Sequence, residues 1–310
     1  MIYIAVDGGT TNTRINLVKD GAVADTVKIK MGARACMSEL AEFKKELKNG
    51  IYSILSRNGL SENDIEKILA SGMITCEFGL CPLEHIVAPA GIKEMHEAMH
   101  EEKFPDISSV PFVFIRGVKT NCENLENADM MRGEETELIG IANNGEAECI
   151  YILPGTHSKI IYTDKTGRIS DFSTMMTGEM IESLSQYTIL KDAVDLSTDG
   201  YDSEYLQKGF SDCRKNGINN TLFKTRILKN LFDADKVQCY SYFMGAVLCG
   251  EIDKILKSKV SGVVIGGKEQ IKLPMKELIE NNSDKNVTTV DAEKCENASA
   301  IGAVCIYEYK

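Results

Sequence analysis

The hydrophobic pattern of the chain begins with an apolar, β-branched run that ends in an acid and two glycines. Residues 2–6 read Ile-Tyr-Ile-Ala-Val, and Asp-Gly-Gly follows at 7–9. A second apolar segment covers residues 14–18, and an Asp-Gly turn at 20–21 leads into a third. This pattern predicts a β-hairpin with no helix after its tip. It therefore excludes the two commonest glycine-rich phosphate loops, in which the glycine turn opens a helix.

The tip of this predicted hairpin has the chemistry of an anion site. Backbone N–H groups of a glycine turn and threonine hydroxyls donate hydrogen bonds that suit a phosphate. Asp7, at the end of the first strand, is placed to hold a magnesium ion through water. A plain tight turn is the alternative, because Asp-Gly-Gly is also a common turn signal. The candidate phosphate ligands are Gly8, Gly9, Thr10, Thr11, Asn12 and Arg14.

The same pattern returns at residues 149–164, where an apolar run, a Gly-Thr tip and a second strand follow one another. Lys159 falls near the position that Arg14 has in the first hairpin, and Pro154 stands at the position of the acid. Two such hairpins, each opening half of the chain, predict a duplicated domain whose phosphate tips face each other. The candidate phosphate ligands in this copy are Gly155, Thr156, His157, Ser158 and Lys159.

Helical and strand spacing predicts an approximate element order, β-β-β-α-β-α-β, in each half of the chain. We expect one domain at residues 1–132 and another at 133–310, with a last helix that is able to pack back toward the first domain. The predicted helices cover residues 38–57 (with Ser38 as N-cap), 92–102, 178–191, 237–257, 269–280 and 296–309. The predicted later strands cover residues 22–30, 67–73, 110–118, 260–265 and 286–290.

A helix that links the two halves is predicted from Leu138, Ile141 and Ala142. Its N-terminal end carries Arg132, Glu134 and Glu135. Acids suit a helix N-terminus without any chemistry, because they complement the helix dipole. Between two phosphate tips, however, a carboxylate at this place would be able to take a proton from an attacking hydroxyl.

Composition limits the classes of partner. The net charge of −11 and the pI near 5.0 argue against nucleic acid or an anionic membrane. No stretch approaches the apolar length of a membrane span, and the N-terminus lacks a basic, apolar signal, so we expect a cytoplasmic protein that binds small molecules. The sequence leaves its oligomeric state open. The ten cysteines lack paired metal spacing and are expected to be reduced thiols.

Three motifs, in order along the chain, resemble those of the 2-dehydro-3-deoxygalactonokinase family. They lie at residues 131–140 (MRGEETELIG), 154–159 (PGTHSK) and 171–179 (DFSTMMTGE). The two hairpins, the linking helix and the Gly-Gly pair at 266–267 also resemble the superfamily of actin, hexokinase and the heat-shock chaperone ATPases. The resemblance implies an α/β fold of duplicated actin/hexokinase-like (ribonuclease H-like) domains. Each would be a mixed β-sheet flanked by helices, with a cleft between the domains.

The resemblance further implies a kinase that uses ATP and Mg²⁺ and transfers the γ-phosphate to the 6-hydroxyl of 2-dehydro-3-deoxy-D-galactonate. It also implies that the nucleotide lies at Gly266 and Gly267, where the backbone of a glycine turn allows close approach of adenosine. The alternatives are a regulatory or activator ATPase of the same superfamily, or a kinase for another sugar. The start of the linking helix favours the kinase, since a kinase needs a base beside the acceptor.

The start of the linking helix departs from the related sugar kinases, which carry an aspartate there as base. A gap-free match puts Gly133 at that position, with Glu134 next to it. We hypothesise that Glu134 accepts the proton of the 6-hydroxyl, because a glutamate with a pKa of about 4.3 is ionised at neutral pH. Glu135, Asp171 and His157 remain alternatives for the base. We expect Arg132 to orient phosphate or the acid, and the sugar acid to be contacted by Arg34 and Glu135.

Overall fold

The computed structural model describes residues 1–142 and 148–310. The chain forms two compact units. The first unit contains Met1–Ala147, Thr163–Asp171 and Glu293–Lys310, and the second contains Glu148–Tyr162 and Phe172–Ala292. The sequence predicts one domain at residues 1–132 and another at 133–310, and this boundary stays a prediction.

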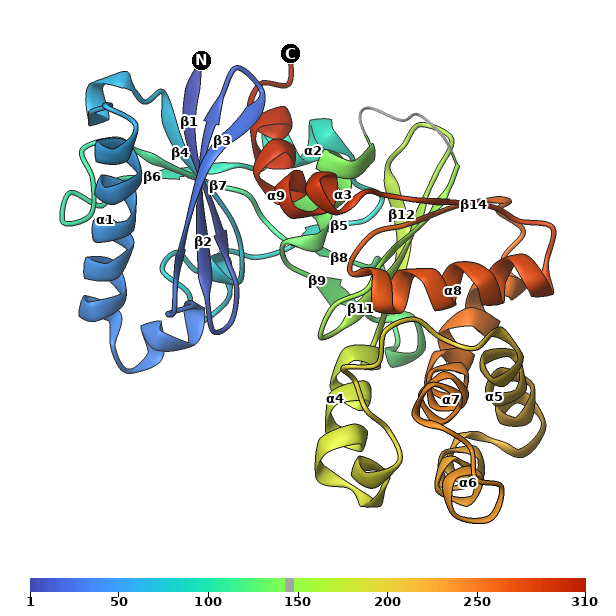
Figure 1. Cartoon of the computed structure of the whole chain (residues 1–310). Helices are drawn as coiled ribbons and strands as arrows, with labels where there is room; N and C mark the ends of the chain where they lie inside the picture. Colours follow the sequence, from blue (N-terminus) through green and yellow to red (C-terminus); the bar gives the residue numbers. More distant parts are fainter. Residues whose placement is uncertain (143–147) are drawn as a thin grey trace. The chain divides into compact units, whose positions relative to one another are not determined.

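The first unit is built on a six-stranded mixed sheet with the order β3-β2-β1-β4-β7-β6 (Figure 1). The predicted hairpin forms its first three strands, which pair antiparallel, and β4 and β7 continue the sheet parallel to β1. The strands are β1 (Ile2–Gly8), β2 (Thr13–Lys19), β3 (Ala22–Ile29), β4 (Lys67–Gly72), β6 (His100–Glu102) and β7 (Phe112–Phe114). A smaller sheet of β5 (Ile86–Val87), β8 (Val118–Lys119) and β9 (Met130–Met131) leads the chain into the linking helix.

Helix α1 (Leu40–Arg57) covers this sheet with the apolar face that its sequence predicts. Phe43, Leu47 and Ile51 are fully buried in one core with residues of β1 and β2. The prediction that Ser38 caps the helix is wrong. A 3₁₀ turn at Ala33–Met37 comes first, and Ser38 ends that turn, so the helix begins after Glu39 without a side-chain cap.

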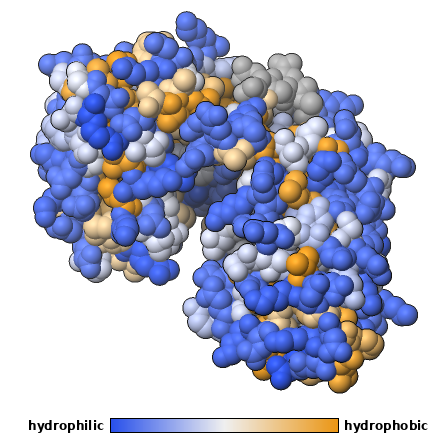
Figure 2. Space-filling model, in the orientation of Figure 1, coloured by the Kyte–Doolittle hydropathy of each residue, from blue (hydrophilic) through white to orange (hydrophobic). Residues whose placement is uncertain are grey.

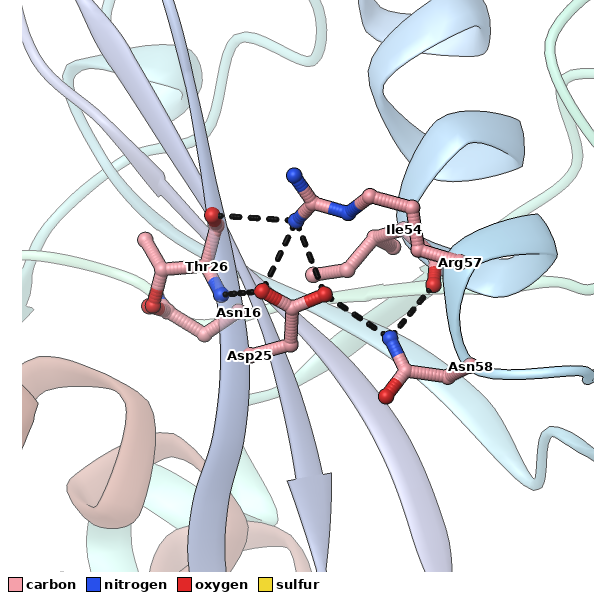
Figure 3. Close-up of polar contacts among 6 residues, drawn as sticks. All are labelled: Asn16, Asp25, Thr26, Ile54, Arg57 and Asn58. Carbon is pink, nitrogen blue, oxygen red and sulfur yellow. Dashed lines mark hydrogen bonds and ion pairs between the residues drawn. The ribbon is translucent and has the colours of Figure 1, made fainter.

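A charged cluster fastens the C-terminal end of α1 to the edge strand β3 (Figure 3). The Arg57 guanidinium donates to both oxygens of Asp25 at 2.8 Å, and Asn58 Nδ2 donates to the same carboxylate at 2.8 Å. Although burial opposes it, these bonds and the N–H of Thr26 hold the pKa of Asp25 below its usual range. The cluster therefore fixes the helix on the sheet at the far end from the hairpin tip.

Two segments of the first unit differ from the predicted elements. The helix predicted at residues 92–102 stops early: α2 covers only Ile92–Glu97, and His100–Glu102 pairs antiparallel with β7 as an edge strand. The strand predicted at 110–118 is divided into β7 and β8. In both segments the strands are set by pairing with neighbouring strands, and not by local periodicity.

The last helix, α9 (Ala292–Tyr307), packs closely on the linking helix α3 (Glu134–Ala142) in the first unit. A Cβ at Gly302 would lie 1.9 Å from the Thr136 oxygen, and a Cβ at Gly140 would lie 1.9 Å from the Ala298 oxygen. Only glycine allows backbones to approach so closely. The helix also begins four residues before the predicted start at residue 296. Its position fixes α3, which carries the candidate acids.

The second unit repeats the topology of the first. Its sheet has the order β12-β11-β10-β13-β14, with β10–β11 antiparallel and β13 parallel to β10, as in β3-β2-β1-β4-β7. This shared order supports the predicted duplication. The strands are β10 (Ile150–Leu153), β11 (Ser158–Thr163), β12 (Ile169–Met175), β13 (Gly262–Ile265) and β14 (Asn286–Thr289).

The helices of the second unit surround α7 (Lys236–Lys257), which is buried along most of its length. Glycines again allow close packing, since a Cβ at Gly209 of α5 (Ser203–Asn216) would lie 2.0 Å from the Tyr242 oxygen of α7. The remaining helices are α4 (Thr177–Tyr187), α6 (Ile218–Leu231) and α8 (Glu269–Asn282).

The surface in view is mainly hydrophilic, and its hydrophobic residues are scattered (Figure 2). In the described part of the chain, no helix combines the length and the apolar composition that crossing a membrane requires.

Candidate functional site

The first hairpin tip has an ordered backbone. Gly9 N donates to Asn12 O at 2.9 Å, and the Asn12 amide donates to the Thr11 hydroxyl at 3.1 Å. Thr11 and Asn12 are exposed. Gly8 lies against the turn that follows β4, since a Cβ at Gly8 would be 2.6 Å from Ile74 Cβ. The tip therefore presents polar groups to solvent on a fixed backbone.

Arg34 lies beside this tip. Ala33 N donates to Gly9 O at 2.9 Å, and Arg34 N donates to Thr10 O at 3.1 Å. A Cβ at Gly32 would lie 2.4 Å from Gly9 O, so glycine is needed for this contact. The Arg34 side chain is exposed. The structure thus brings together two predicted groups, the first tip and Arg34, that are separated by two strands in the sequence.

Asp7 ends β1 directly before the tip and pairs across the hairpin with Arg14. Burial raises the pKa of Asp7, and the positive charge of Arg14 opposes that change. Arg14 is itself held by α9, because its Nη1 donates to Glu296 O at 3.3 Å. A desolvated carboxylate of this kind gains from a nearby divalent cation, and oxygen is the ligand that Mg²⁺ prefers. The residues therefore fit a magnesium ion.

The start of α3 lies close to Asp7 through two glycines. A Cβ at Gly72, at the end of β4, would be 3.5 Å from Asp7 Oδ1. A Cβ at Gly133 would be 3.3 Å from Gly72 Cα. Both glycines have positive φ, 84° and 109°, a conformation that other residues rarely adopt. These two positions let the helix start approach the end of β1.

Three acids of α3 lie in this part of the first unit. Glu134 is half-buried, and its carboxylate accepts from Arg132 N at 3.1 Å. Glu135 is fully buried, and its carboxylate accepts from Gly133 N at 2.8 and 2.9 Å. Burial, and then the charge of Glu134, raise the pKa of Glu135 to about 8. Of these two candidates for the base, only Glu134 remains accessible.

Glu137 is an acid that sequence reasoning missed. Burial raises its pKa to about 8, with further contributions from Glu134 and Asp7 and an opposing one from Arg14. It follows Glu134 by three residues, which places both on one face of α3. The three-residue spacing from Glu134 was the signal in the sequence. It was not followed because a glutamate within a helix usually faces solvent.

Arg132 connects the helix start to the irregular segment that follows β4. Its guanidinium donates to Thr75 Oγ1 at 2.9 Å and to the Leu83 carbonyl at 2.7 Å. Desolvation lowers the pKa of Arg132. These contacts show a structural function for the side chain, and its contact with phosphate or the sugar acid stays a prediction.

The second unit brings the second tip together with the Gly-Gly pair. Gly266 N donates to Ile152 O at 2.9 Å, and a Cβ at Gly267 would lie 2.9 Å from the Pro154 oxygen. Gly267 has a φ of 77°, which explains the glycine. Leu153 pairs with Lys159 at the end of β10, and Asp7 pairs with Arg14 next to the end of β1. β10 carries no acid at this end.

The polar residues of the second tip differ in exposure. His157 is exposed, and its Nε2 lies 3.3 Å from Glu179 Oε1. Lys159 is buried, and its Nζ donates to Thr174 Oγ1 at 2.6 Å. Ser158 is buried as well, whereas Thr156 is exposed. Phosphate contacts from this tip would therefore come first from its exposed part, residues 155–157.

Asp171, an alternative base, is exposed in the middle of β12. The other two candidate acids, Glu134 and Glu135, both accept hydrogen bonds from the backbone just before α3. The choice among these acids stays a prediction.

A second group of possible metal ligands lies on the edge strand β6. Cys81 Sγ is 3.3 Å from Glu102 Oε2, and His100 Nε2 is 3.4 Å from the same oxygen. Burial, and then Glu102, raise the pKa of the Cys81 thiol to about 12. The Cys81 thiol donates to Glu102 and His100 lies beside the same carboxylate, so we describe the group as a hydrogen-bonded cluster.

A cavity of about 630 Å³ in the first unit lies elsewhere, among residues of α2, α9 and the turn after β11. None of the predicted site residues lines it. We therefore assign no substrate to it.

A duplicated mixed sheet, with a polar tip on the first hairpin of each copy, defines the class of actin/hexokinase-like ATPases. The family model of 2-keto-3-deoxy-galactonokinase matches residues 7–302, so this chain belongs to that family. It is an ATP-dependent carbohydrate kinase, as the motif resemblance implied.

Individual relatives agree with this assignment. The probable 2-dehydro-3-deoxygalactonokinase of Rhizobium meliloti (strain 1021) is 28% identical over 97% of this chain and 96% of its own. The 2-dehydro-3-deoxygalactonokinase of Escherichia coli (strain K12) is 23% identical over 85% of this chain and 78% of its own. A crystal structure assigned to the same activity, from Sinorhizobium meliloti, has a TM-score of 0.79 at 25% identity and covers 98% of this chain and 97% of that one. The predicted fold class is confirmed.

Proposed function

We propose that this kinase transfers the γ-phosphate of ATP to the 6-hydroxyl of 2-dehydro-3-deoxy-D-galactonate, giving 2-dehydro-3-deoxy-6-phosphogalactonate. The observation that carries the proposal is the arrangement in the first unit. There the phosphate tip, Asp7 and the acid-bearing start of α3 meet through Gly72 and Gly133. Phosphoryl transfer depends mainly on positioning and electrostatics, and this arrangement supplies both.

Asp7 is the proposed ligand, through water, of a magnesium ion. Such an ion would neutralise charge on the β- and γ-phosphates. Burial raises the pKa of Asp7 and the positive charge of Arg14 opposes that change; a bound cation would act in the same direction as Arg14. The tip residues Gly9 and Thr10 are proposed to contact phosphate oxygens beside it.

Glu134 is the proposed base. Its carboxylate is accessible, whereas that of Glu135 is buried and already accepts the N–H of Gly133. In the proposed step, Glu134 takes the proton of the 6-hydroxyl as the hydroxyl oxygen attacks the γ-phosphorus and ADP leaves. Glu135 fixes the helix start through Gly133 N and is also proposed to contact the sugar acid.

The sugar acid carries a carboxylate that needs a cation or several N–H donors. Arg34 is the proposed cation, because its backbone is fixed on the first tip while its side chain remains exposed. The adenosine of ATP is proposed to lie at Gly266 and Gly267, which adjoin the second tip in the second unit.

The function is tested by ADP release with a panel of acceptors. We expect rapid release with 2-dehydro-3-deoxy-D-galactonate, and only background release with its 6-deoxy analogue or with no acceptor. The C4 epimer of the acid tests the alternative of another sugar, because a site that hydrogen-bonds one hydroxyl rejects the wrong epimer strongly. Equal rates with and without acceptor would contradict the proposal.

The base is tested by Glu134→Gln. General-base catalysis contributes about 10²–10⁴-fold, so turnover should fall by a factor in that range while the KM of the sugar acid changes little. Arg34→Ala should instead raise the KM of the acid. Glu135→Gln and Asp171→Asn test the two alternative acids. If either of these variants abolishes turnover while Glu134→Gln retains it, the proposed base is wrong.

A further inference from the structure

Glu251 is a buried acid of the second unit that has no part in the function proposed above. It lies on α7 and is 2% exposed. Its Oε1 accepts from the Ser158 hydroxyl at 2.5 Å, and its Oε2 accepts from the Thr177 hydroxyl at 2.7 Å. Both hydroxyl residues are buried as well. A buried carboxylate is costly unless it is paired or hydrogen-bonded, and here both oxygens have donors.

The two hydroxyls belong to segments that border the second phosphate tip. Ser158 is the first residue of β11 and ends the tip, and Thr177 is the first residue of α4. One carboxylate of the central helix therefore holds the end of the tip and the start of a neighbouring helix together.

Other contacts join the same two segments. Glu179 N donates to Thr156 O at 3.1 Å. A Cβ at Gly178 would lie 2.2 Å from Gly155 O and 2.8 Å from Thr156 Cα. The tip backbone thus rests directly on the first turn of α4, and its position depends on where that turn is held.

We infer that Glu251 is a positioning residue that fixes the second tip in the conformation that receives the phosphates of ATP. This inference rests on the proposed function of the tip. A loop that is fixed before binding loses little conformational freedom when the ligand arrives, so loss of the Glu251 contacts weakens nucleotide binding although Glu251 touches no nucleotide. The competing explanation is that the cluster only stabilises the second unit.

The test is the affinity for ADP, measured by calorimetry on the full chain well below its melting temperature. In Glu251→Gln the amide oxygen keeps one acceptor, while the amide N–H replaces the other acceptor with a donor, so one of the two hydroxyls has to turn its own proton away and accept instead. We expect the Kd of ADP to rise about tenfold or more, with the KM of the sugar acid unchanged within about twofold. Asp212→Asn is the matched control, since its carboxylate accepts from Tyr242 OH at 2.7 Å in the same unit. It should change the melting temperature but not the Kd.

Thr177→Val provides a second variant that does not depend on Glu251→Gln being folded. It removes one hydroxyl donor, and it should also raise the Kd of ADP. If the two residues act through one contact, the double variant should bind ADP about as weakly as Glu251→Gln alone, because coupled residues are not additive.

Three outcomes overturn the inference. Glu251→Gln and Thr177→Val could both lower the melting temperature yet keep the wild-type Kd, which would show a purely structural cluster. The Kd could rise equally in the Asp212→Asn control. The effects of the two variants on the Kd could also be fully additive.

If Gly266→Val weakens ADP binding in these experiments and Glu251→Gln does not, only the inference fails. If the wild-type chain does not bind ADP, the proposed function fails with it.

Discussion

At the residue scale, the surroundings of Asp7 bear on the role proposed for it. Burial raises the pKa of this carboxyl, so its charge is unfavourable in the protein alone. An ionised acid at this position does not stabilise the fold by itself. The magnesium ion proposed above would supply the positive charge that favours its ionised form.

The Asp7→Asn variant should therefore separate catalysis from stability. We expect turnover to fall by at least about 100-fold, because charge on the β- and γ-phosphates is no longer neutralised. The melting temperature should stay the same or rise slightly, since an amide is cheaper to bury than a carboxylate. The two measurements are steady-state ADP release and a thermal melting curve. Near wild-type turnover in a folded variant would remove Asp7 from the magnesium site.

Glu135 predicts a pH dependence of stability. Its pKa in the folded chain is raised to about 8, against 4.5 ordinarily, so between these values the folded state holds a proton that the unfolded state has released. Stability must then fall as pH rises through this window. Glu135→Gln removes that penalty, so its unfolding free energy relative to wild type should increase from pH 5 to pH 8. Urea unfolding at several pH values measures this, and parallel curves for the two proteins would contradict it.

At the scale of elements, the contact between α3 and α9 couples the last helix to the candidate acids. The two helices approach so closely that glycine is required at Gly140 and Gly302. Arg14, beside Asp7, also donates to the backbone of α9. The last helix therefore supports both the helix start and the first hairpin, although it lies at the other end of the sequence.

Gly302→Ala should damage both stability and activity. The added methyl group would lie 1.9 Å from the Thr136 oxygen, so α3 and α9 must separate. Overpacking of this kind costs about 1–3 kcal/mol, and a shift of α3 moves Glu134, so turnover should fall as well. Gly250→Ala on α7 is the control, because nothing lies within 4 Å of its Cβ position. It should be neutral or stabilising, and an equal loss in both variants would contradict the interpretation.

At the scale of the whole molecule, the candidate groups are divided between the units. The sugar-acid candidates and the acids belong to the first unit, and the second tip with Gly266 and Gly267 belongs to the second. The two substrates should thus be separable by mutation. A variant of the Gly-Gly turn ought to lose nucleotide and keep the sugar acid.

Gly266→Val tests this division by ligand stabilisation. A ligand at 100 times its Kd stabilises the folded state by about 2.7 kcal/mol. We expect the stabilisation by ADP to be largely lost in the variant, because the side chain blocks the approach of adenosine, while the sugar acid still raises the melting temperature. Calorimetry with each ligand gives the affinities directly. Unchanged ADP affinity would place adenosine elsewhere.

Local patterns in the sequence determined a large part of this protein. The alternation of apolar residues and the Asp20-Gly21 turn were sufficient for the first hairpin, and the repeat at residues 149–164 for the duplication. Both signals work because backbone period and turn geometry depend on neighbouring residues only. The motifs carried the family for the same reason, since they are contiguous.

The tertiary structure alone decided which candidate groups are available for chemistry. It placed Glu135 in the interior and left Glu134 accessible, although the two are neighbours in the sequence. It brought Glu137 to Asp7, and Glu251 to the second tip. It also paired residues 100–102 as an edge strand where periodicity predicted helix. In each case the outcome depends on burial and on partners distant in the chain, and no local pattern encodes the electric field or the packing that such partners create.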